Sequence, residues 1–416
     1  MRSWVFPAFL AGVMRATDWM GPGSRGYLWG IAFVLSLISL TTVWFGYAWG
    51  KRAGGMSAAI LAAGACAIWF ELVFFGSKSF TEVLAAHVLL PGLYLGAYPI
   101  RGNEKKSLFL AGLFCGLALS LRIQLAPAIL FAVLYFCYPH WRKRALPIAL
   151  GILIPVLAFG LVDAFTWSHP FQSFWLYFSV NYSIVEGRSL LGGTAPWYWY
   201  LVRIARRLGP VALLAIVGAR RSPLLGWIAL IILVSHSMLA HKEIRYIYPL
   251  VPIALTLSAL GVLEIVREIN SRWKSALRPG VAVVAALVFY AFCSGFLASR
   301  FPDWSRRGGS LIALERLSTD SAVCGVGVEG VDLWDSASYT YLHQKVPIII
   351  VPRATELQSG TSSFNALLLT DRSLAAPRAG FDLVRCWKEA CLYERPGACA
   401  PDPFNEINAV AERTGR

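Results

Sequence analysis

Long apolar stretches separated by short polar ones fill the chain from residue 28 to residue 299. A helix needs about 20 predominantly apolar residues to cross the hydrocarbon core of a bilayer, so each stretch predicts one membrane span. The predicted spans are Leu28–Trp49, Met56–Phe75, Glu82–Pro99, Ser107–Leu121, Gln124–Tyr138, Ala145–Phe165, Leu208–Ala219, Pro223–Ala240, Tyr246–Val266 and Pro279–Ser299. The fourth, fifth and seventh are short enough to be tilted, broken or re-entrant. We therefore expect a transmembrane domain of about ten spans in residues 1–300.

The basic residues between these stretches indicate the topology, because Lys and Arg collect in loops on the cytoplasmic side of a membrane. Ten spans place five basic clusters on one side, which is then the cytoplasmic side. The clusters are Lys51–Arg52, Arg101 with Lys105 and Lys106, Arg142–Arg144, Arg220–Arg221, and the basic residues from Arg267 to Arg278. Arg203, Arg206 and Arg207 fall on the opposite side and predict an interfacial amphipathic helix with snorkelling side chains.

The same alternation places the N-terminus and everything after residue 300 outside the cytoplasm. The first 27 residues contain no signal peptide, because Arg2 and Arg15 interrupt the apolar stretch and no small-residue cleavage site follows. An external N-terminus needs a span before it. We therefore expect a further transmembrane helix upstream of Met1.

After Arg300 charged residues return and apolar runs shrink to strand length, at 322–328, 346–351 and 365–369. Helical periodicity appears at 311–317, so residues 301–416 predict a small soluble α/β domain on the periplasmic or lumenal side. Its four cysteines, Cys324, Cys386, Cys391 and Cys399, would face an oxidising compartment. They allow three pairings, and we expect one bridge among the last three.

Composition agrees with a mostly α-helical, polytopic membrane protein. Hydrophobic residues make up 57% of the chain and charged residues 15%, whereas soluble domains carry about 45–50% and about 25%. The net charge of +15 does not predict nucleic-acid binding, because the basic residues lie in short clusters between apolar runs. The 16 Trp and 16 Tyr are typical of aromatic belts at membrane interfaces.

The most chemically specific string is His241-Lys242-Glu243-Ile244-Arg245-Tyr246, at the external end of a predicted span. Ionisable groups at a membrane boundary are costly unless they are paired or hydrated. One interpretation is a short charged loop with an internal Glu243–Arg245 or Lys242–Glu243 pair. The other is a cationic cluster that receives a phosphate, which Arg and Lys bind well. No metal-ligand spacing accompanies His241, so neither a metal nor another cofactor is expected.

Other polar and aromatic residues fall on the same predicted face. Glu82, Arg122, Gln124 and Asp163 lie at or near external ends of spans, and such residues are functional candidates. The external segment 163–200 is rich in aromatic residues, which suits either carbohydrate stacking or an interfacial belt. Its candidate substrate-binding residues are Asn181, Trp197, Trp199 and Tyr200. Together these positions predict one external cavity.

These motifs resemble the dolichyl-phosphate-mannose-dependent α-mannosyltransferases of the GT-C superfamily, which act on GPI anchors and N-glycans. His241-Lys242-Glu243-x-Arg245-Tyr246, followed by Pro249 and Pro252, is similar to the family's His-Lys-Glu-x-Arg-Phe signature. The segment from Asp163 through Asn181 to Gly193-Thr194-x-Pro196-Trp197-x-Trp199-Tyr200 is similar to a second external block. Ser79-x-Thr81-Glu82, Arg122 near Pro127, and Arg2-Ser3-Trp4-x-x-Pro7 match weaker motifs. The resemblance covers about residues 1–260 and leaves out the C-terminal domain.

The resemblance implies a GT-C helical bundle that moves a hexose, expected to be mannose, from a polyprenyl-phosphate donor to an acceptor hydroxyl with inversion. His241, Lys242, Arg245 and Arg122 would bind the donor phosphate, with Glu243 and Gln124 in support. Family members take their catalytic base from an acidic pair in a first external loop, which would precede Met1. Glu82 and Asp163 are only weak substitutes for that base.

The expected partners are the lipid-linked donor, a glycan or glycolipid acceptor and the bilayer, with no nucleic acid. We expect a multi-pass protein of a bacterial inner membrane rather than of the endoplasmic reticulum. The alternatives are a transporter or flippase of lipid-linked substrates, and an inactive truncated member of the family. Internal repeats, which are frequent in transporters, are not evident in the sequence.

Overall fold

The computed structural model of the 416-residue chain describes residues 3–21, 24–183, 195–273, 278–301, 308–329, 341–351, 363–369, 375–387 and 390–413. The chain divides into two compact units. The first contains Met1–Arg15 and Ile31–Phe301, and the second contains Ala16–Gly30 and Pro302–Arg416. The sequence pattern predicts a boundary after residue 300 but contains no sign that Ala16–Gly30 belongs with the C-terminal residues.

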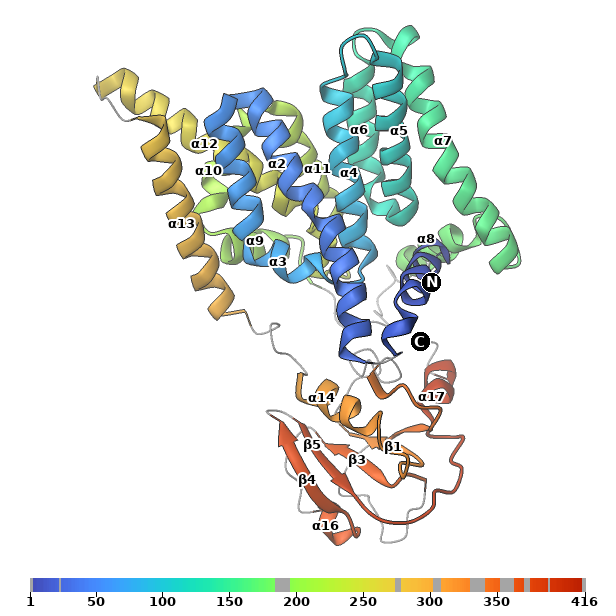
Figure 1. The fold of residues 1–416 in the computed structure, drawn as a ribbon. Coiled ribbons are helices and arrows are strands. Elements are labelled where there is room, and N and C mark those ends of the chain that lie inside the picture. Colours follow the sequence, from blue (N-terminus) through green and yellow to red (C-terminus); the bar gives the residue numbers. More distant parts are fainter. Residues whose placement is uncertain are drawn as a thin grey trace. The chain divides into compact units, whose positions relative to one another are not determined.

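The first unit is helical throughout its described residues (Figure 1). Its helices are α1 (Val5–Ala16), α2 (Arg25–Ile68, in this unit from Ile31 on), α3 (Phe70–Gly76), α4 (Thr81–Ala97), α5 (Glu104–Leu121), α6 (Ala126–Cys137), α7 (Trp141–Thr166), α8 (Gln172–Ser183), α9 (Trp199–Leu208), α10 (Pro210–Ala219), α11 (Pro223–Ser237), α12 (Leu250–Trp273) and α13 (Pro279–Ser299). The short 3-10 helices η2 (Ile123–Leu125) and η4 (Ile244–Ile247) lie between α5 and α6 and between α11 and α12.

Helix α2 turns back on itself at Gly55, whose φ of +80° is a conformation that glycine adopts without steric cost. The two arms then pack closely, because a Cβ at Gly46 would lie 2.9 Å from the Ala62 carbonyl oxygen. A Cβ at Gly50 would lie 2.6 Å from that of Ala58. The predicted span Leu28–Trp49 and most of the next one therefore form a helical hairpin.

The predicted span Met56–Phe75 is wrong in its last turns, because the helix breaks at Trp69 and α3 begins at Phe70. Backbone groups exposed by a break inside a bilayer need new partners. Ser294 of α13 supplies them: its hydroxyl accepts from the Phe70 N–H at 2.8 Å and donates to the Ile68 carbonyl at 2.8 Å. A contact 224 residues away in the sequence thus decides where the helix ends.

By length and hydropathy, four of the described helices could cross a membrane, in α2, α7, α12 and α13. The bent pair α3–α4 would make a fifth, and α6, α10 and α11 are apolar but shorter. These helices confirm a multi-pass membrane protein. The total of about ten spans stays a prediction.

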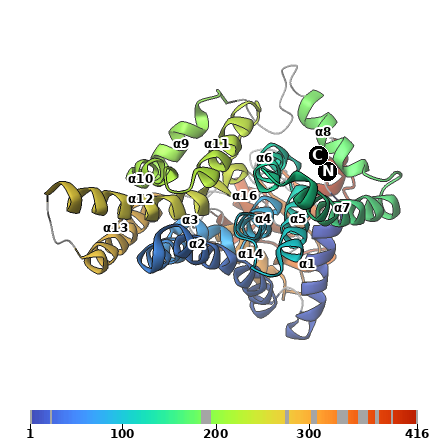
Figure 2. The ribbon, with the colours of Figure 1, turned by 90° about the horizontal axis from the view of Figure 1, so that it is seen from above.

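Close helix contacts fix the part of this unit that carries the site. Figures 1 and 2 show α4, α5 and α6 side by side, with α7 next to α5. A Cβ at Gly112 of α5 would lie 2.2 Å from the Ile148 oxygen of α7, and one at Gly218 of α10 would lie 1.8 Å from the Leu257 oxygen of α12. Such small-residue contacts are typical of helix packing in membranes, where backbones can approach closely.

The second unit contains a five-stranded mixed sheet in the order β2-β1-β3-β5-β4. Its elements are α14 (Gly308–Leu317), β1 (Val326–Val328), β2 (Ile348–Ile350), β3 (Ala366–Leu369), α16 (Ala375–Arg378), β4 (Asp382–Trp387), β5 (Ala390–Glu394) and α17 (Ile407–Arg413). Strands β2, β1 and β3 are parallel, whereas β5 and β4 are antiparallel. The helix and three strands predicted from apolar runs are confirmed, and the β4–β5 hairpin was not predicted.

Both faces of the sheet are covered at its central strand, β3. Along β3, Ala366 and Leu368 join the apolar cluster that includes α14, and Leu367 and Leu369 join the opposite cluster. A strand buried on both faces reads as a continuous apolar run, which is why β3 was visible in the sequence. This small sheet after a helical bundle confirms the expected fold class.

Two disulfides join the four cysteines of the second unit, Cys324 to Cys399 and Cys386 to Cys391. The second bridge confirms the expectation of a pair among the last three cysteines. It links facing residues of β4 and β5. Cys66, Cys115, Cys137 and Cys293 are free and buried in the first unit.

These pairings predict a thiol count that reports the compartment of the second unit. If that unit lies outside the cytoplasm, the chain unfolded in detergent without reductant should take up four maleimide-polyethylene glycol groups. After reduction it should take up eight. Gel shifts measure both numbers. Eight adducts without reduction would place these cysteines in a reducing compartment.

Candidate active site

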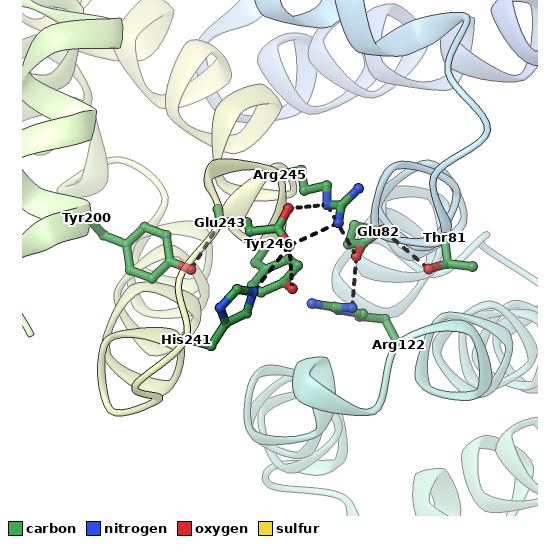
Figure 3. A network of polar contacts seen from close by, with 8 residues as sticks. All are labelled: Thr81, Glu82, Arg122, Tyr200, His241, Glu243, Arg245 and Tyr246. Carbon is green, nitrogen blue, oxygen red and sulfur yellow. Dashed lines mark hydrogen bonds and ion pairs between the residues drawn. The ribbon is translucent and has the colours of Figure 1, made fainter. Parts of the chain in front are cut away.

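Three connections between helices bring the predicted polar residues together at one end of the first unit. The start of α4 supplies Glu82, the turn between α5 and η2 supplies Arg122, and the segment leading into η4 supplies Glu243 and Arg245. Figure 3 shows these side chains pointing toward one another. The structure therefore brings these four predicted residues together, and their role in a functional site stays a prediction.

Arg122 is placed by the end of α5. Its N–H still bonds to the Ala118 carbonyl at 2.9 Å, but its own backbone is extended, with φ −149° and ψ 93°. Pro127 follows within the first turn of α6, where its fixed φ is compatible with a new helix. The short turn directs the Arg122 side chain toward the start of α4.

Glu82 and Arg122 form a buried ion pair. Arg122 Nη1 donates to Glu82 Oε1 at 2.9 Å, and the two side chains are only 2% and 1% exposed. Thr81 donates to the other carboxylate oxygen at 3.3 Å, and Arg245 Nε lies 4.0 Å from Glu82 Oε1. Taking two charges out of water is expensive, so such a pair is weak evidence for net stability, whereas removing one of its partners is strongly destabilising.

Glu243 is the centre of a second set of contacts. Its Oε1 accepts from Tyr246 at 2.9 Å and Arg245 Nη2 at 3.0 Å and lies 3.2 Å from His241 Nε2. The Glu243–Arg245 pair is the internal pair of the simpler interpretation of this string, and it coexists with the cluster. Tyr200 also donates to the Glu243 carbonyl at 3.1 Å.

These contacts control the charge of Glu243. Burial alone would raise the pKa of its carboxyl, but the hydrogen bonds from His241 and Tyr246 and the charge of Arg245 outweigh burial and lower the pKa to about 2. The stabilising contacts are therefore fully present above the ordinary value of 4.5 and are lost as pH falls through about 2. At neutral pH Glu243 is a carboxylate that holds Arg245 in place.

Aromatic rings fix the planes of both guanidinium groups. Arg122 Cζ lies 4.3 Å from the centre of the Tyr246 ring, and Arg245 Cζ lies 4.7 Å from that of Phe80. Cations over aromatic faces are attracted by the ring quadrupole. Each arginine is thus held by at least one carboxylate and one ring.

The remaining edge of Arg122 faces a small cavity of about 40 Å³. Its Nε and Nη2 are buried and have no hydrogen-bond partner among the described residues, and the same is true of Ser3 Oγ, Ser120 Oγ and Gln124 Oε1. All four residues line this cavity, together with Ser173 and Tyr177. Buried polar groups are nearly always bonded to protein or water. Their convergence therefore marks a place that receives a polar group.

Lys242 lies outside this network although the sequence groups it with His241 and Arg245. Its ammonium donates to the carbonyl oxygens of Ala195, at 3.0 Å, and Leu239. Its side chain is buried, and burial lowers the pKa of Lys242. The Ala195 contact ties the segment leading into η4 to the segment before α9, and the phosphate role of Lys242 remains only a prediction.

Asp163 is also away from the cluster. One carboxylate oxygen accepts from the Ser173 N–H at 3.0 Å and from the Ser173 hydroxyl. The contact satisfies a backbone donor in the first turn of α8, as a capping residue does. Asp163 is fully buried and thereby positions Ser173, which lines the cavity.

The predicted substrate-binding residues lie in α8, in α9 and in the segment just before α9. Tyr200 is buried beneath Glu243, whereas Trp197 is 68% exposed. Trp199 packs on Tyr200, with ring centres 5.1 Å apart, and under Arg203. Asn181 lies in α8, but its side chain and the Gly193–Thr194 motif lie outside the described residues.

Several residues of this site are not predicted from the sequence. Tyr246 belongs to the motif that carries the resemblance, but its contact with Arg122 depends on a turn 124 residues earlier in the chain. Ser3 and Ser120 carry no local signal, because isolated serines are common. Among the residues that the structure describes, no group of three His, Cys, Asp or Glu could hold a metal ion.

A bundle of apolar helices with two guanidinium–carboxylate pairs at one end defines a membrane protein with a polar site at a membrane boundary. The family model for Alg9-like mannosyltransferases matches residues 1–323. The chain belongs to this family, as the sequence resemblance predicts.

Named relatives agree with this assignment. A GPI alpha-1,2-mannosyltransferase 3 from Xenopus laevis is 25% identical over 56% of this chain and 43% of that protein. A probable Dol-P-Man:Man(7)GlcNAc(2)-PP-Dol alpha-1,6-mannosyltransferase from Schizosaccharomyces pombe is 27% identical over 62% and 47%. The chain spans about half the length of these relatives. Both are eukaryotic, so they do not support the expected bacterial inner membrane, and nothing supports a transporter.

A solved structure shows the same fold. ArnT from Cupriavidus metallidurans, crystallised with undecaprenyl phosphate, matches with a TM-score of 0.63 over 95% of this chain and 88% of ArnT. The two sequences are 13% identical, so the likeness concerns the fold alone. It agrees with the expected GT-C architecture.

The buried ion pair predicts that Glu82→Gln is strongly destabilising. The change leaves the Arg122 charge buried without its carboxylate, which costs about 3–5 kcal/mol. Unfolding in mixed detergent micelles measures the loss. The double variant Glu82→Gln/Arg122→Gln should lose less than the two single variants together, since no unpaired charge remains.

The matched control is Glu268→Gln, which removes a carboxylate that is 58% exposed and paired with Arg272 on α12. An exposed pair contributes about 0–1 kcal/mol, so this variant should unfold nearly as the parent does. Equal losses of stability in Glu82→Gln and Glu268→Gln would show that the buried pair matters no more for stability than the exposed pair.

Proposed function

We propose that this protein transfers a hexose, mannose by its family, from a polyprenyl-phosphate donor to an acceptor hydroxyl on the non-cytoplasmic side of a membrane. Family membership supports the reaction class, since the named relatives are mannosyltransferases. The undecaprenyl phosphate bound by ArnT supports the class of lipid carrier. The acceptor would be a glycan or glycolipid.

The observation that carries the proposal is the edge of Arg122 that has no hydrogen-bond partner in the described part of the chain. Nε and Nη2 of one guanidinium form a fork that matches two oxygens of a phosphate. Both are buried next to a cavity whose volume, about 40 Å³, corresponds to roughly three water-sized groups. Arg245 adds a second cation to the same cluster. We assign the donor phosphate to Arg122 first, with Arg245 and His241 in support.

The reaction needs two things from the site. A base takes the proton of the acceptor hydroxyl, whose oxygen then forms a bond to C1 of the donor sugar. The bond from C1 to the phosphate oxygen breaks, and its electron pair stays on the leaving polyprenyl phosphate. Arg122 and Arg245 would stabilise the charge that develops there, because preorganised donors act most strongly at a developing anion.

The two carboxylates of the cluster suit positioning better than proton transfer. Glu243 has a pKa near 2, so it is a poor acceptor for a proton at neutral pH. Glu82 is buried against Arg122 and near Arg245. Asp163 holds the start of α8. We therefore propose that these acids orient cations and helices, and we assign the base to none of them.

Acceptor contacts are proposed for the exposed segment just before α9. Trp197 offers a large exposed ring, and aromatic faces suit sugar stacking, although an interfacial belt would use the same residue. Asn181 stays a candidate on sequence grounds. We propose that the reaction takes place on the non-cytoplasmic face of the membrane, whether that membrane is a bacterial inner membrane or the endoplasmic reticulum.

Substitution of the two arginines tests the phosphate assignment. Arg122→Gln and Arg245→Gln should each weaken binding of a polyprenyl phosphate by roughly 30-fold or more, as expected when a buried charge loses its partner. Transfer of labelled mannose from a polyprenyl-phosphate donor should fall on the order of 10²–10³-fold. Arg206→Gln is the control, because it removes an exposed cation from the neighbouring helix α9.

Direct binding keeps this test independent of turnover. Thermal unfolding of each variant separates a lost phosphate contact from a lost fold, and Arg245→Gln is informative if Arg122→Gln unfolds. Unchanged binding in both folded variants would remove the phosphate from this cluster. Flipping of the lipid-linked sugar in proteoliposomes without any transfer would favour a transporter instead.

A further inference from the structure

A second groove lies between the N-terminal ends of α5 and α7. The Arg122 turn follows the other, C-terminal end of α5. The groove has a volume of about 650 Å³ and is formed where both helices begin. Its lining residues are Glu104, Lys105, Leu108, Arg142, Lys143, Arg144, Leu146, Pro147 and Leu150. By the distribution of basic clusters this end faces the cytoplasm. The groove is therefore separate from the proposed active site.

The basic side chains that line the groove outnumber its acidic side chains. Arg144 Nη2 pairs with Glu104 at 2.7 Å, and Arg144 Nη1 bonds to the Phe136 carbonyl at 3.1 Å, so this arginine joins α7 to α5 and α6. Lys105, Arg142 and Lys143 also line the groove. None of these three has an ion pair with another described residue. Three cations at the mouth of the groove thus have no anionic partner among the described residues.

Below the cations the lining is aliphatic. On α7, Arg142, Leu146 and Leu150 recur every four residues and so lie on one stripe of the helix. Leu146 and Leu150 are 65% and 47% exposed, as expected of side chains that meet acyl chains. On α5, Lys105 lies three residues before Leu108, so these two side chains also lie on one face of their helix. Both helices therefore present a cation above a leucine.

Exposed aromatic residues indicate the depth of the groove in the bilayer. Trp141, next to Arg142, is 43% exposed, and Tyr138 before it is 72% exposed. Exposed Trp and Tyr gather at the headgroup level of a bilayer. The cations are therefore at headgroup depth, and Leu146 and Leu150 are one and two turns deeper.

We infer that this groove binds an anionic phospholipid of the adjacent leaflet, with its phosphate on Lys105, Arg142 and Lys143 and an acyl chain along Leu146 and Leu150. The charge selects an anionic headgroup over a zwitterionic one. The aliphatic lining selects a lipid over a free phosphate, which would leave that surface unused. This inference does not depend on the proposed transferase reaction.

A neighbouring groove shows why basic residues alone are not enough. It has a volume of about 560 Å³ and is lined by Trp44, Tyr47, Ala48, Lys51, Arg52 and Tyr94. There Lys51 lies over the Tyr47 ring and Arg52 over the Tyr98 ring, at 5.6 Å and 6.0 Å from the ring centres. Those cations already have aromatic partners, and no row of leucines lies beneath them.

The test compares lipid binding by the full chain in detergent, measured by native mass spectrometry. Lys105→Gln/Lys143→Gln removes two cations of the groove. Lys106→Gln/Arg101→Gln removes the same charge from the same cluster of residues but outside the groove lining. Dioleoylphosphatidylglycerol, dioleoylphosphatidylcholine and inorganic phosphate are the probes, and gel filtration confirms that each variant is folded.

We expect the parent and the Lys106→Gln/Arg101→Gln control to retain phosphatidylglycerol in preference to phosphatidylcholine. Lys105→Gln/Lys143→Gln should weaken phosphatidylglycerol binding roughly thirtyfold, because each cation near an anionic surface contributes about 1 kcal/mol. Equal losses in both double variants would overturn the inference, as would equal retention of the two lipids. Displacement of the lipid by millimolar inorganic phosphate would assign the site to free phosphate instead.

Discussion

The buried ion pair between Glu82 and Arg122 is the constraint on which the rest of the site depends. Two charges that are almost fully removed from water lose their hydration and must be compensated by geometry. The pair joins the first turn of α4 to the turn after α5, and Arg245 approaches the same carboxylate. Any shift of these helices would separate the charges, so the pair fixes the relative position of three connections.

A carboxylate and an aromatic ring together orient each of the two arginines. Glu82 and Tyr246 orient Arg122, while Glu243 and Phe80 orient Arg245. A guanidinium held in this way needs little reorganisation when an anion arrives, which is the basis of electrostatic preorganisation. Since Arg122 has donors left over at the cavity, it is the residue through which the proposed phosphate contact is made.

Hydropathy and charge alternation predicted the helical bundle, the external grouping of Glu82, Arg122, Glu243 and Arg245, and three of the five strands. These features depend on periodicity and on the solvent around each segment, which sequence records. The break at Trp69 depends on Ser294, and the placement of Lys242 depends on Ala195, so both are tertiary. The exposed strand β4 is partly charged and carries no apolar run. Long-range partners and the β4–β5 hairpin are therefore what the sequence left out.

The most direct measurement is a structure of the full chain with a polyprenyl phosphate bound. Our account predicts phosphate oxygens within about 3 Å of Arg122 Nε and Nη2, with Arg245 beside them and Glu82 still paired to Arg122. It also predicts that the lipid chain leaves the site toward the bilayer. A phosphate bound elsewhere on the same face, with the donors of Arg122 satisfied by water alone, would contradict the central claim.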